Sequence, residues 1–170
     1  ILIKNCIPEH LDSLSAKILE VGGKIETFDD SLRVTCDGPI TPANIKTLPY
    51  PGFPTDMQPI IGALLTKANG TSNITENIFE NRFKYLEELK RMGADISING
   101  KTATIIGVDK LTGTKVNSND LRGGAALVVA GLIADGTTEV ENADYILRGY
   151  ENFDKKLSKL GANIKLKKVI

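Results

Sequence analysis

The stretch PYPGFPTDMQPIIGALLTKA, residues 49–68, decides how the rest of the chain can fold. Its first part is stiff, because three prolines restrict the backbone between residues 49 and 54 and the glycine among them favours a turn. Its second part, residues 57–68, is apolar on nearly every side, and a helix of that kind is buried. The sequence therefore predicts a rigid loop that delivers Asp56 to the positive end of a buried helix.

A second segment repeats this pattern further along the chain. Residues 121–134 are again apolar nearly all round, and Asp120 precedes them as Asp56 precedes the first segment. Both segments are followed by a Gly-Thr turn, at 70–71 and at 136–137, and then by a short strand. We therefore predict two buried helices at the centre of one fold.

Other segments predict surface helices that each end at a glycine and lead into a strand. The glycines are Gly22, Gly93 and Gly161, each at a helix end that favours positive φ. In the third copy, apolar residues recur every three or four positions from Ile146 to Leu160. That spacing predicts one continuous surface helix with a single apolar stripe.

The first two surface helices are followed by predicted β-hairpins. Residues 94–106 form two strand-like runs around an Asn-Gly pair at 99–100, which is the strongest signal for a two-residue hairpin turn. Residues 24–36 form a weaker equivalent around the Asp-Asp pair at 29–30. Counted from the strand before each buried helix, the repeated unit is βαβαββ.

These repeats predict the fold class. The chain is α/β and forms one domain over residues 1–170, built from βαβαββ units. The first unit is incomplete, because the chain starts at the strand-like residues 1–3 without a buried helix before them. We expect the corresponding helix to come from elsewhere in a longer protein.

The composition argues against several classes of protein. Lys+Arg and Asp+Glu are both 21, and a net charge of zero is not that of a general nucleic-acid binder. No apolar run reaches the roughly 18 residues of a membrane span, so we expect a cytosolic protein without a membrane partner. Two cysteines, Cys6 and Cys36, with one histidine are too few for a disulfide framework or a zinc site. Both cysteines are predicted to be small buried hydrophobes.

Asp56 admits two interpretations. In the structural one, Thr55 is the N-cap of the buried helix and Asp56 lies in its positive first turn. In the functional one, the rigid loop holds Asp56 as a catalytic or ligand-binding group at the helix N-terminus. The prolines favour the second, because a cap alone does not require so stiff a loop.

The arginines suggest an anionic ligand. A cation near a helix N-terminus opposes the helix dipole, so Arg122 requires a carboxylate neighbour, such as Asp120, or a bound anion. Arg82 and Arg148 lie in matching regions of two repeats and are either solvated helix residues or members of a cluster. A cluster would suit a phosphate or carboxylate compound, because Arg binds these groups bidentately.

The motifs around these residues resemble those of one known family. They are Pro51–Gln58, Glu80–Phe83, Arg91–Ala94, Asp120–Arg122 and Arg148–Glu151. In their order along the chain they are similar to the UDP-N-acetylglucosamine 1-carboxyvinyltransferases, a family of enolpyruvyl transferases. The resemblance implies an inside-out α/β barrel of two domains, each with three βαβαββ units, and it matches this chain to the C-terminal domain.

The resemblance also implies a function. The family transfers an enolpyruvyl group from phosphoenolpyruvate to the 3′-hydroxyl of UDP-N-acetylglucosamine, the first committed step of peptidoglycan synthesis in the bacterial cytoplasm. The expected partners are these two small molecules and an N-terminal domain. That domain carries the family's catalytic cysteine, and neither Cys6 nor Cys36 lies in a matching context. The chain by itself is therefore expected to be inactive.

The resemblance assigns roles residue by residue. Asp56 corresponds to the aspartate that contacts the 3′-hydroxyl and acts as the base. Ile78 corresponds to a backbone contact with UDP-N-acetylglucosamine, and Arg148 to an arginine that binds phosphoenolpyruvate across the closed cleft. The remaining matches are cleft residues with supporting roles in substrate binding: Arg82, Asp120 and Arg122.

The residues alone leave a second function open, a non-catalytic binding module built from repeats that takes an anionic small molecule. In either case no metal and no cofactor is expected, because the sequence has no P-loop, no dinucleotide glycine fingerprint and no metal-ligand cluster.

Overall fold

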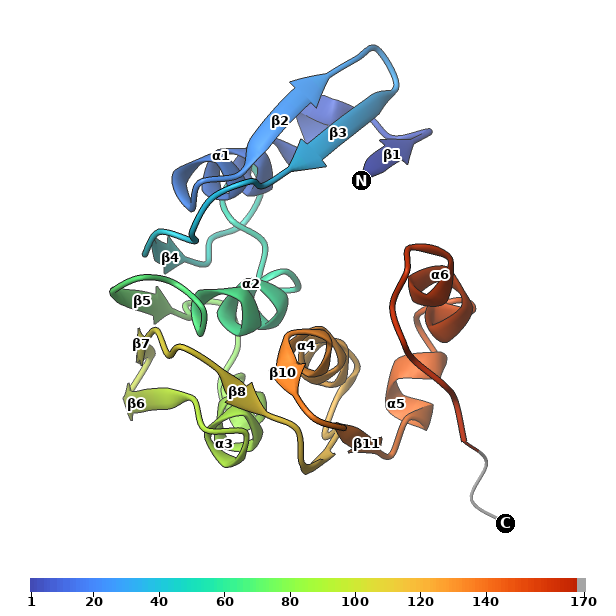
Figure 1. Ribbon diagram of the computed structural model, residues 1–170. Coiled ribbons are helices and arrows are strands. Elements are labelled where there is room, and N and C mark those ends of the chain that lie inside the picture. The colour runs from blue at the N-terminus through green and yellow to red at the C-terminus, as the bar shows by residue number, and fades with distance from the viewer. Residues whose placement is uncertain (168–170) are drawn as a thin grey trace.

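The order of helices and strands follows the predicted repeats (Figure 1). The structure is a computed structural model that describes residues 1–167. In chain order the elements are β1 (Leu2–Lys4), η1 (Pro8–Leu11), α1 (Asp12–Glu20), β2 (Lys24–Thr27), β3 (Ser31–Thr35), β4 (Asn44–Lys46), α2 (Gln58–Leu65), β5 (Thr71–Thr75), α3 (Lys84–Arg91), β6 (Asp95–Asn99), β7 (Thr102–Ile106), β8 (Leu111–Thr112), β9 (Lys115–Asn117), α4 (Leu121–Leu132), β10 (Ala134–Asp135), β11 (Glu139–Glu141), α5 (Asp144–Leu147) and α6 (Phe153–Lys159).

Helices α2 and α4 pack against each other in the middle of the ribbon (Figure 1). Ile61, Ala63 and Leu65 of α2 are at most 3% exposed, and α4 buries every residue from Gly123 to Val128. A helix that is apolar all round gains most by burying every face, so each of the two covers the other. The prediction of two buried helices is confirmed.

Helix α2 is shorter than predicted. The predicted segment was 57–68, whereas the α-helix is Gln58–Leu65. The amides of residues 66–68 bond to carbonyls three residues back, and the Thr66 hydroxyl donates to the Ala63 carbonyl at 2.7 Å. The last turn therefore tightens into a 3₁₀-like end.

Within residues 1–167 no helix is both long enough and apolar enough to span a bilayer.

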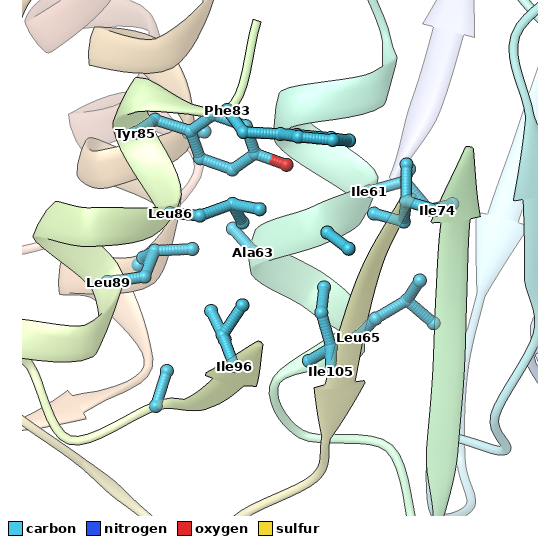
Figure 2. Close-up of a cluster of buried hydrophobic side chains, with 14 of the residues drawn as sticks. Ile61, Ala63, Leu65, Ile74, Phe83, Tyr85, Leu86, Leu89, Ile96 and Ile105 are labelled. Atoms are coloured by element: carbon cyan, nitrogen blue, oxygen red, sulfur yellow. The ribbon is translucent and has the colours of Figure 1, made fainter. Parts of the chain in front are cut away.

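The second repeat unit is complete. Its sheet has the order β4-β5-β7-β6, in which β4 and β5 are parallel and the other two pairs are antiparallel. Helix α2 is the crossover between the parallel strands, and α3 follows β5. Figure 2 shows Ile74, Ile96 and Ile105 of this sheet in the same apolar layer as Leu65 of α2 and Leu86 of α3. The predicted βαβαββ unit is confirmed here.

The other two units repeat parts of this pattern. The first sheet has the order β1-β3-β2 and is antiparallel throughout. It corresponds to strands β5, β7 and β6 of the second unit. In the third unit, β8 and β9 precede α4 in the chain. Each pairs in parallel with a strand that follows α4, β8 with β10 and β9 with β11. Helix α1 has no fully buried residue, in contrast to α3, which buries Tyr85, Leu86 and Leu89.

The third surface helix is not continuous, so that prediction is wrong. It consists of α5 and α6, separated by residues 148–152, with Asn152 in the left-handed region at φ 48°. Gly149 and Asn152 have weak helix propensity, and they fall between apolar residues whose spacing alone suggested one helix. The rings of Tyr150 and Phe153 still pack together, with centroids 4.9 Å apart.

The predicted hairpins are present, with a small difference at one turn. Asn99 pairs with Thr102, so the two turn residues are Gly100 and Lys101 rather than the Asn-Gly pair. Gly100 has φ 56°, which a residue without a Cβ adopts at little cost. The hairpin of β2 and β3 turns at residues 29–30 as predicted.

The prediction that both cysteines are buried is wrong. Cys36 is exposed and Cys6 is half-buried, and both are free thiols. Each lies just beyond a strand of the first sheet, where the chain has left the core.

A close contact between α2 and α3 generates a prediction on stability. A Cβ added at Gly62 would lie 2.3 Å from the buried Tyr85 hydroxyl, which Figure 2 shows pointing toward α2. We expect Gly62→Ala to lower the free energy of unfolding by about 1–3 kcal/mol through overpacking, although Ala favours a helix more than Gly by about 1 kcal/mol. In a Tyr85→Phe background the loss should be much smaller, because the remaining neighbours, the ring carbon Cζ of residue 85 at 3.2 Å and Ile74 Cδ1 at 3.3 Å, are close but do not overlap the new methyl group. Urea unfolding of the four variants measures both effects, and an equal loss in both backgrounds would contradict this packing.

Candidate functional site

The loop before α2 is folded upon itself. The Leu48 amide donates to the Phe53 carbonyl at 3.1 Å, and the Gly52 amide donates to the Pro49 carbonyl at 2.8 Å. Phe53 is 5% exposed and so anchors the loop in the core. The stiffness predicted from the prolines is therefore supported by backbone hydrogen bonds, and Pro54 and Thr55 lead from this closed segment to Asp56.

Asp56 is not a helix cap, and neither is Thr55. Helix α2 begins at Gln58 and has no side-chain cap hydrogen bond. The Thr55 hydroxyl instead donates to Glu76 Oε2 at 2.9 Å. The structural interpretation of this pair is therefore wrong, because the chain makes one more turn at residues 54–57 before the helix starts.

The Asp56 carboxylate joins two arginines from distant parts of the chain. Arg82 Nη2 donates to Oδ1 at 3.0 Å, and Arg122 Nη2 donates to Oδ2 at 2.8 Å. The Asp56 side chain is 51% exposed, whereas those of Arg82 and Arg122 are 18% and 29% exposed. The cluster holds one more cation than anion, and its carboxylate faces solvent, so it suits a polar ligand that carries negative charge.

The carboxylate that pairs with the Arg122 guanidinium is not the predicted Asp120. Asp120 Oδ1 accepts the backbone amides of Arg122 at 2.9 Å and of Gly123 at 2.8 Å, which makes Asp120 the N-cap of α4. The capping role predicted for Asp120 is confirmed, but the carboxylate that neutralises the Arg122 guanidinium is Asp56. This hydrogen bond to Asp56 raises the pKa of Arg122, so the guanidinium stays charged.

Each candidate arginine also lies over an aromatic ring. Arg82 lies over Phe79 at 5.6 Å, and Arg148 lies over Tyr145 at 5.5 Å, measured from Cζ to the ring centroid. Such cation–π contacts hold a guanidinium in one orientation. These rings were not predicted from the sequence, although the i,i+3 spacing of both pairs on helix-like segments was a usable signal. The Arg122 Cζ lies 5.3 Å from the centroid of the Tyr150 ring. These two residues are far apart in the chain, so no local spacing indicates the contact.

Ile78 and Arg148 line two separate hollows, and the hollow at Ile78 includes Arg82 of the cluster. Ile78 lines a hollow of about 410 Å³ that also includes Arg82 and Lys101. Arg148 lines a hollow of about 330 Å³ with Asn142, Asp144 and Tyr145. Within residues 1–167, no ion pair joins Arg148 to Asp56. The neighbouring Gly149 packs against Leu121 at the start of α4, which places Arg148 at the same end of that helix as Arg122.

The part of the chain covered by the structure has no group of three His, Cys, Asp or Glu side chains arranged as metal ligands. The chemistry that the cluster itself offers is acid–base chemistry at a carboxylate and anion binding at guanidinium groups.

Comparison with known proteins identifies the family of this chain. The sequence model of EPSP synthase (3-phosphoshikimate 1-carboxyvinyltransferase) matches residues 1–157. The chain belongs to the EPSP synthase family. The matched range includes all of the candidate site residues.

Individual relatives are more informative than the family model about which members of the family resemble this chain. UDP-N-acetylglucosamine 1-carboxyvinyltransferase 3 of Caldanaerobacter subterraneus subsp. tengcongensis is 55% identical over 164 residues, which is 96% of this chain and 39% of that protein. The UDP-N-acetylglucosamine 1-carboxyvinyltransferase of Desulfofundulus thermocisternus is 54% identical over 96% of this chain and 68% of its own length. This chain thus spans 39% of the length of one and 68% of the other.

Solved structures agree with the predicted fold class. The enolpyruvyl transferase NikO from Streptomyces tendae superposes with a TM-score of 0.87 at 25% identity, over 96% of this chain and 39% of that one. EPSP synthase from Acinetobacter baumannii matches in fold alone, with a TM-score of 0.59 at 19% identity over 78% of this chain and 32% of its own. The prediction of an enolpyruvyl transferase α/β fold is confirmed.

The separate duties of the two aspartates give a prediction. Asp120→Ala removes the cap of α4 and should lower the free energy of unfolding by about 0.5–2 kcal/mol. Asp120→Asn should stay within about 0.5 kcal/mol of the parent protein, because Asn is an equally good N-cap. Urea unfolding measures both. Equal losses for Ala and Asn would show that the charge of Asp120, rather than its cap hydrogen bonds, stabilises this end of α4.

Proposed function

We propose that this chain is the C-terminal domain of a UDP-N-acetylglucosamine 1-carboxyvinyltransferase. The whole protein transfers an enolpyruvyl group from phosphoenolpyruvate to the 3′-hydroxyl of UDP-N-acetylglucosamine. The observation that carries the proposal is the 54–55% identity, over nearly the whole chain, to relatives that bear this name. The reaction belongs to peptidoglycan synthesis, and we place it in the bacterial cytoplasm.

In this proposal Asp56 is the catalytic base. It takes the proton of the 3′-hydroxyl as that oxygen adds to C2 of phosphoenolpyruvate, while the electron pair of the C2=C3 bond takes up a proton at C3. Loss of phosphate from C2 and of a proton from C3 then restores the double bond. Both of its oxygens already accept from arginines, but a carboxylate has about four lone-pair sites, so each oxygen retains one for the substrate. The half-exposed position of Asp56 supports access by a sugar hydroxyl.

The arginines and Ile78 bind the substrates in this proposal. Arg82 and Arg122 orient Asp56 and offset negative charge, and the other N–H groups of each guanidinium remain for substrate oxygens. Arg148 binds phosphoenolpyruvate, supported by its fixed position over Tyr145. Asp120 holds the start of α4, and with it Arg122, in place. The backbone of Ile78 contacts UDP-N-acetylglucosamine from the neighbouring hollow.

The other half of the site belongs to an N-terminal domain in this proposal. That domain supplies the catalytic cysteine, and closure of the two domains excludes water and assembles the groups around the transferred unit. The chain by itself would therefore hold half a site and be inactive.

The competing function is a non-catalytic binding module for an anionic small molecule, which the net positive cluster would also suit. The transferase and the binding module predict different coding sequences upstream of Ile1. A preceding domain with a cysteine-bearing loop supports the transferase, whereas its absence supports the binding module.

Turnover by the full-length protein tests the proposal. The expected result is formation of enolpyruvyl-UDP-N-acetylglucosamine and phosphate from the two substrates. Asp56→Ala should reduce kcat by about 10²–10⁴-fold while the circular dichroism spectrum stays unchanged. The matched control is Asp37→Ala, which removes an exposed ion pair with Lys24 away from the cluster and should keep full turnover. Full turnover by Asp56→Ala would refute the role of Asp56 as base.

A half-site should also bind weakly. Isothermal titration of the isolated chain with UDP-N-acetylglucosamine should give a Kd above about 1 mM, because the groups of the second domain are absent. Tight binding by the isolated chain would contradict the requirement for both domains and favour the binding module.

A further inference from the structure

Glu76 is a buried carboxylate with an unusual set of donors. It lies directly after β5 and is 2% exposed. Oε1 accepts the Thr47 hydroxyl and the Ile78 amide, each at 2.8 Å, and the Phe79 amide at 3.2 Å. Oε2 accepts the Thr55 hydroxyl at 2.9 Å. Four donors satisfy a group whose burial would otherwise be costly.

These donors come from three segments around the candidate site. Thr47 follows β4, where the loop toward α2 begins, and Thr55 lies where that loop ends, immediately before Asp56. The Ile78 and Phe79 amides belong to the turn that lines the neighbouring hollow. The Glu76 carboxylate therefore connects both ends of the loop that leads to Asp56 with the turn at Ile78 and Phe79.

The corresponding position of the third unit lacks this arrangement. The strand registers place Asn142 there, and its side-chain amide donates to Asn117 Oδ1 at 2.7 Å. The two units differ in the link to the buried helix: it spans residues 47–57 before α2 but only residues 118–120 before α4. The long link carries Asp56 and requires a tether, whereas the short link is held by its own helix cap.

We propose that Glu76 is a positioning residue for the transfer reaction. It touches neither substrate. It sets the position of Asp56 through Thr55 and the position of the Ile78–Phe79 turn through its Oε1 atom, so that the base and the backbone contact form one rigid surface. This inference rests on the proposed function for its effect on turnover, but the tether itself is a property of the fold.

Selective variants in the full-length protein separate the links. Thr55→Val removes only the link to Asp56, because Val keeps the shape of Thr without the hydroxyl. Glu76→Gln keeps an acceptor at Oε1 and places an amide donor opposite the Thr55 hydroxyl, so it should retain the tether. Glu76→Ala removes both acceptor oxygens and so breaks all four hydrogen bonds. The matched control is Thr75→Val, which removes a part-buried hydroxyl contact with Thr102 one residue before Glu76.

The expected readout is a split between kcat and KM. Thr55→Val should lower kcat by about tenfold to a hundredfold, since a small displacement of a catalytic group has effects of this size. Its KM for UDP-N-acetylglucosamine should stay within about twofold of the parent value, because the Ile78–Phe79 turn remains tied. Glu76→Gln should retain most of kcat, whereas Glu76→Ala should lose kcat and raise KM. Thr75→Val should match the parent protein.

Hydrogen exchange provides a second readout that does not depend on activity. In Thr55→Val, the Met57 and Gln58 amides should exchange about fivefold to tenfold faster, as expected for one lost hydrogen bond, while the Ile78 and Phe79 amides keep their protection. Unchanged exchange at Met57 and Gln58, or a kcat for Thr55→Val equal to that of Thr75→Val, would overturn the tether. A parent protein without transferase activity would instead refute the proposed function, and the exchange data would still decide whether Glu76 holds the loop.

Discussion

Contact between α2 and α4, two helices without a polar face, is the constraint on which the structure depends. Because both helices are apolar on nearly every face, each is covered by the other, by strands and by surface helices, and α3 packs against both of them. The complete second unit shows how: its parallel strands flank the α2 crossover, and α3 covers the apolar layer with Tyr85, Leu86 and Leu89 (Figure 2). Close packing then leaves room only for glycine at Gly62.

The same contact creates the candidate site. It brings the start of α2 beside the start of α4, so that Asp56 and Arg122, 66 residues apart, come within 2.8 Å. Both helix N-termini carry partial positive charge there, which favours anionic groups at this end of the molecule. The ion pairs themselves add little stability at their degree of exposure. What they determine is the orientation of a carboxylate and two guanidinium groups toward solvent.

Features that depend on local pattern were predicted correctly more often than features that depend on contact between distant residues. The buried helices, the hairpins and the three glycines with positive φ all follow from local periodicity and backbone preference, and they are present. The continuous third helix was wrong because side-chain spacing does not register the break at Asn152. The cap at Thr55 was wrong because its hydroxyl has a better-placed acceptor in Glu76, a residue that local pattern does not connect to it.

The α/β repeat, the buried character of two helices and the stiffness of the loop before Asp56 could be predicted from the sequence, because each depends on residues close together in the chain. The pairing of carboxylates with cations, in contrast, depends on contacts between distant segments and became known from the folded chain. Asp120 is close to Arg122 in the sequence and was the expected partner of its guanidinium. Its carboxylate instead accepts backbone amides as the N-cap of α4, and the guanidinium pairs with Asp56. The burial of Glu76 was likewise decided by packing between segments, since a charged residue at a strand end is solvated unless distant donors converge on it.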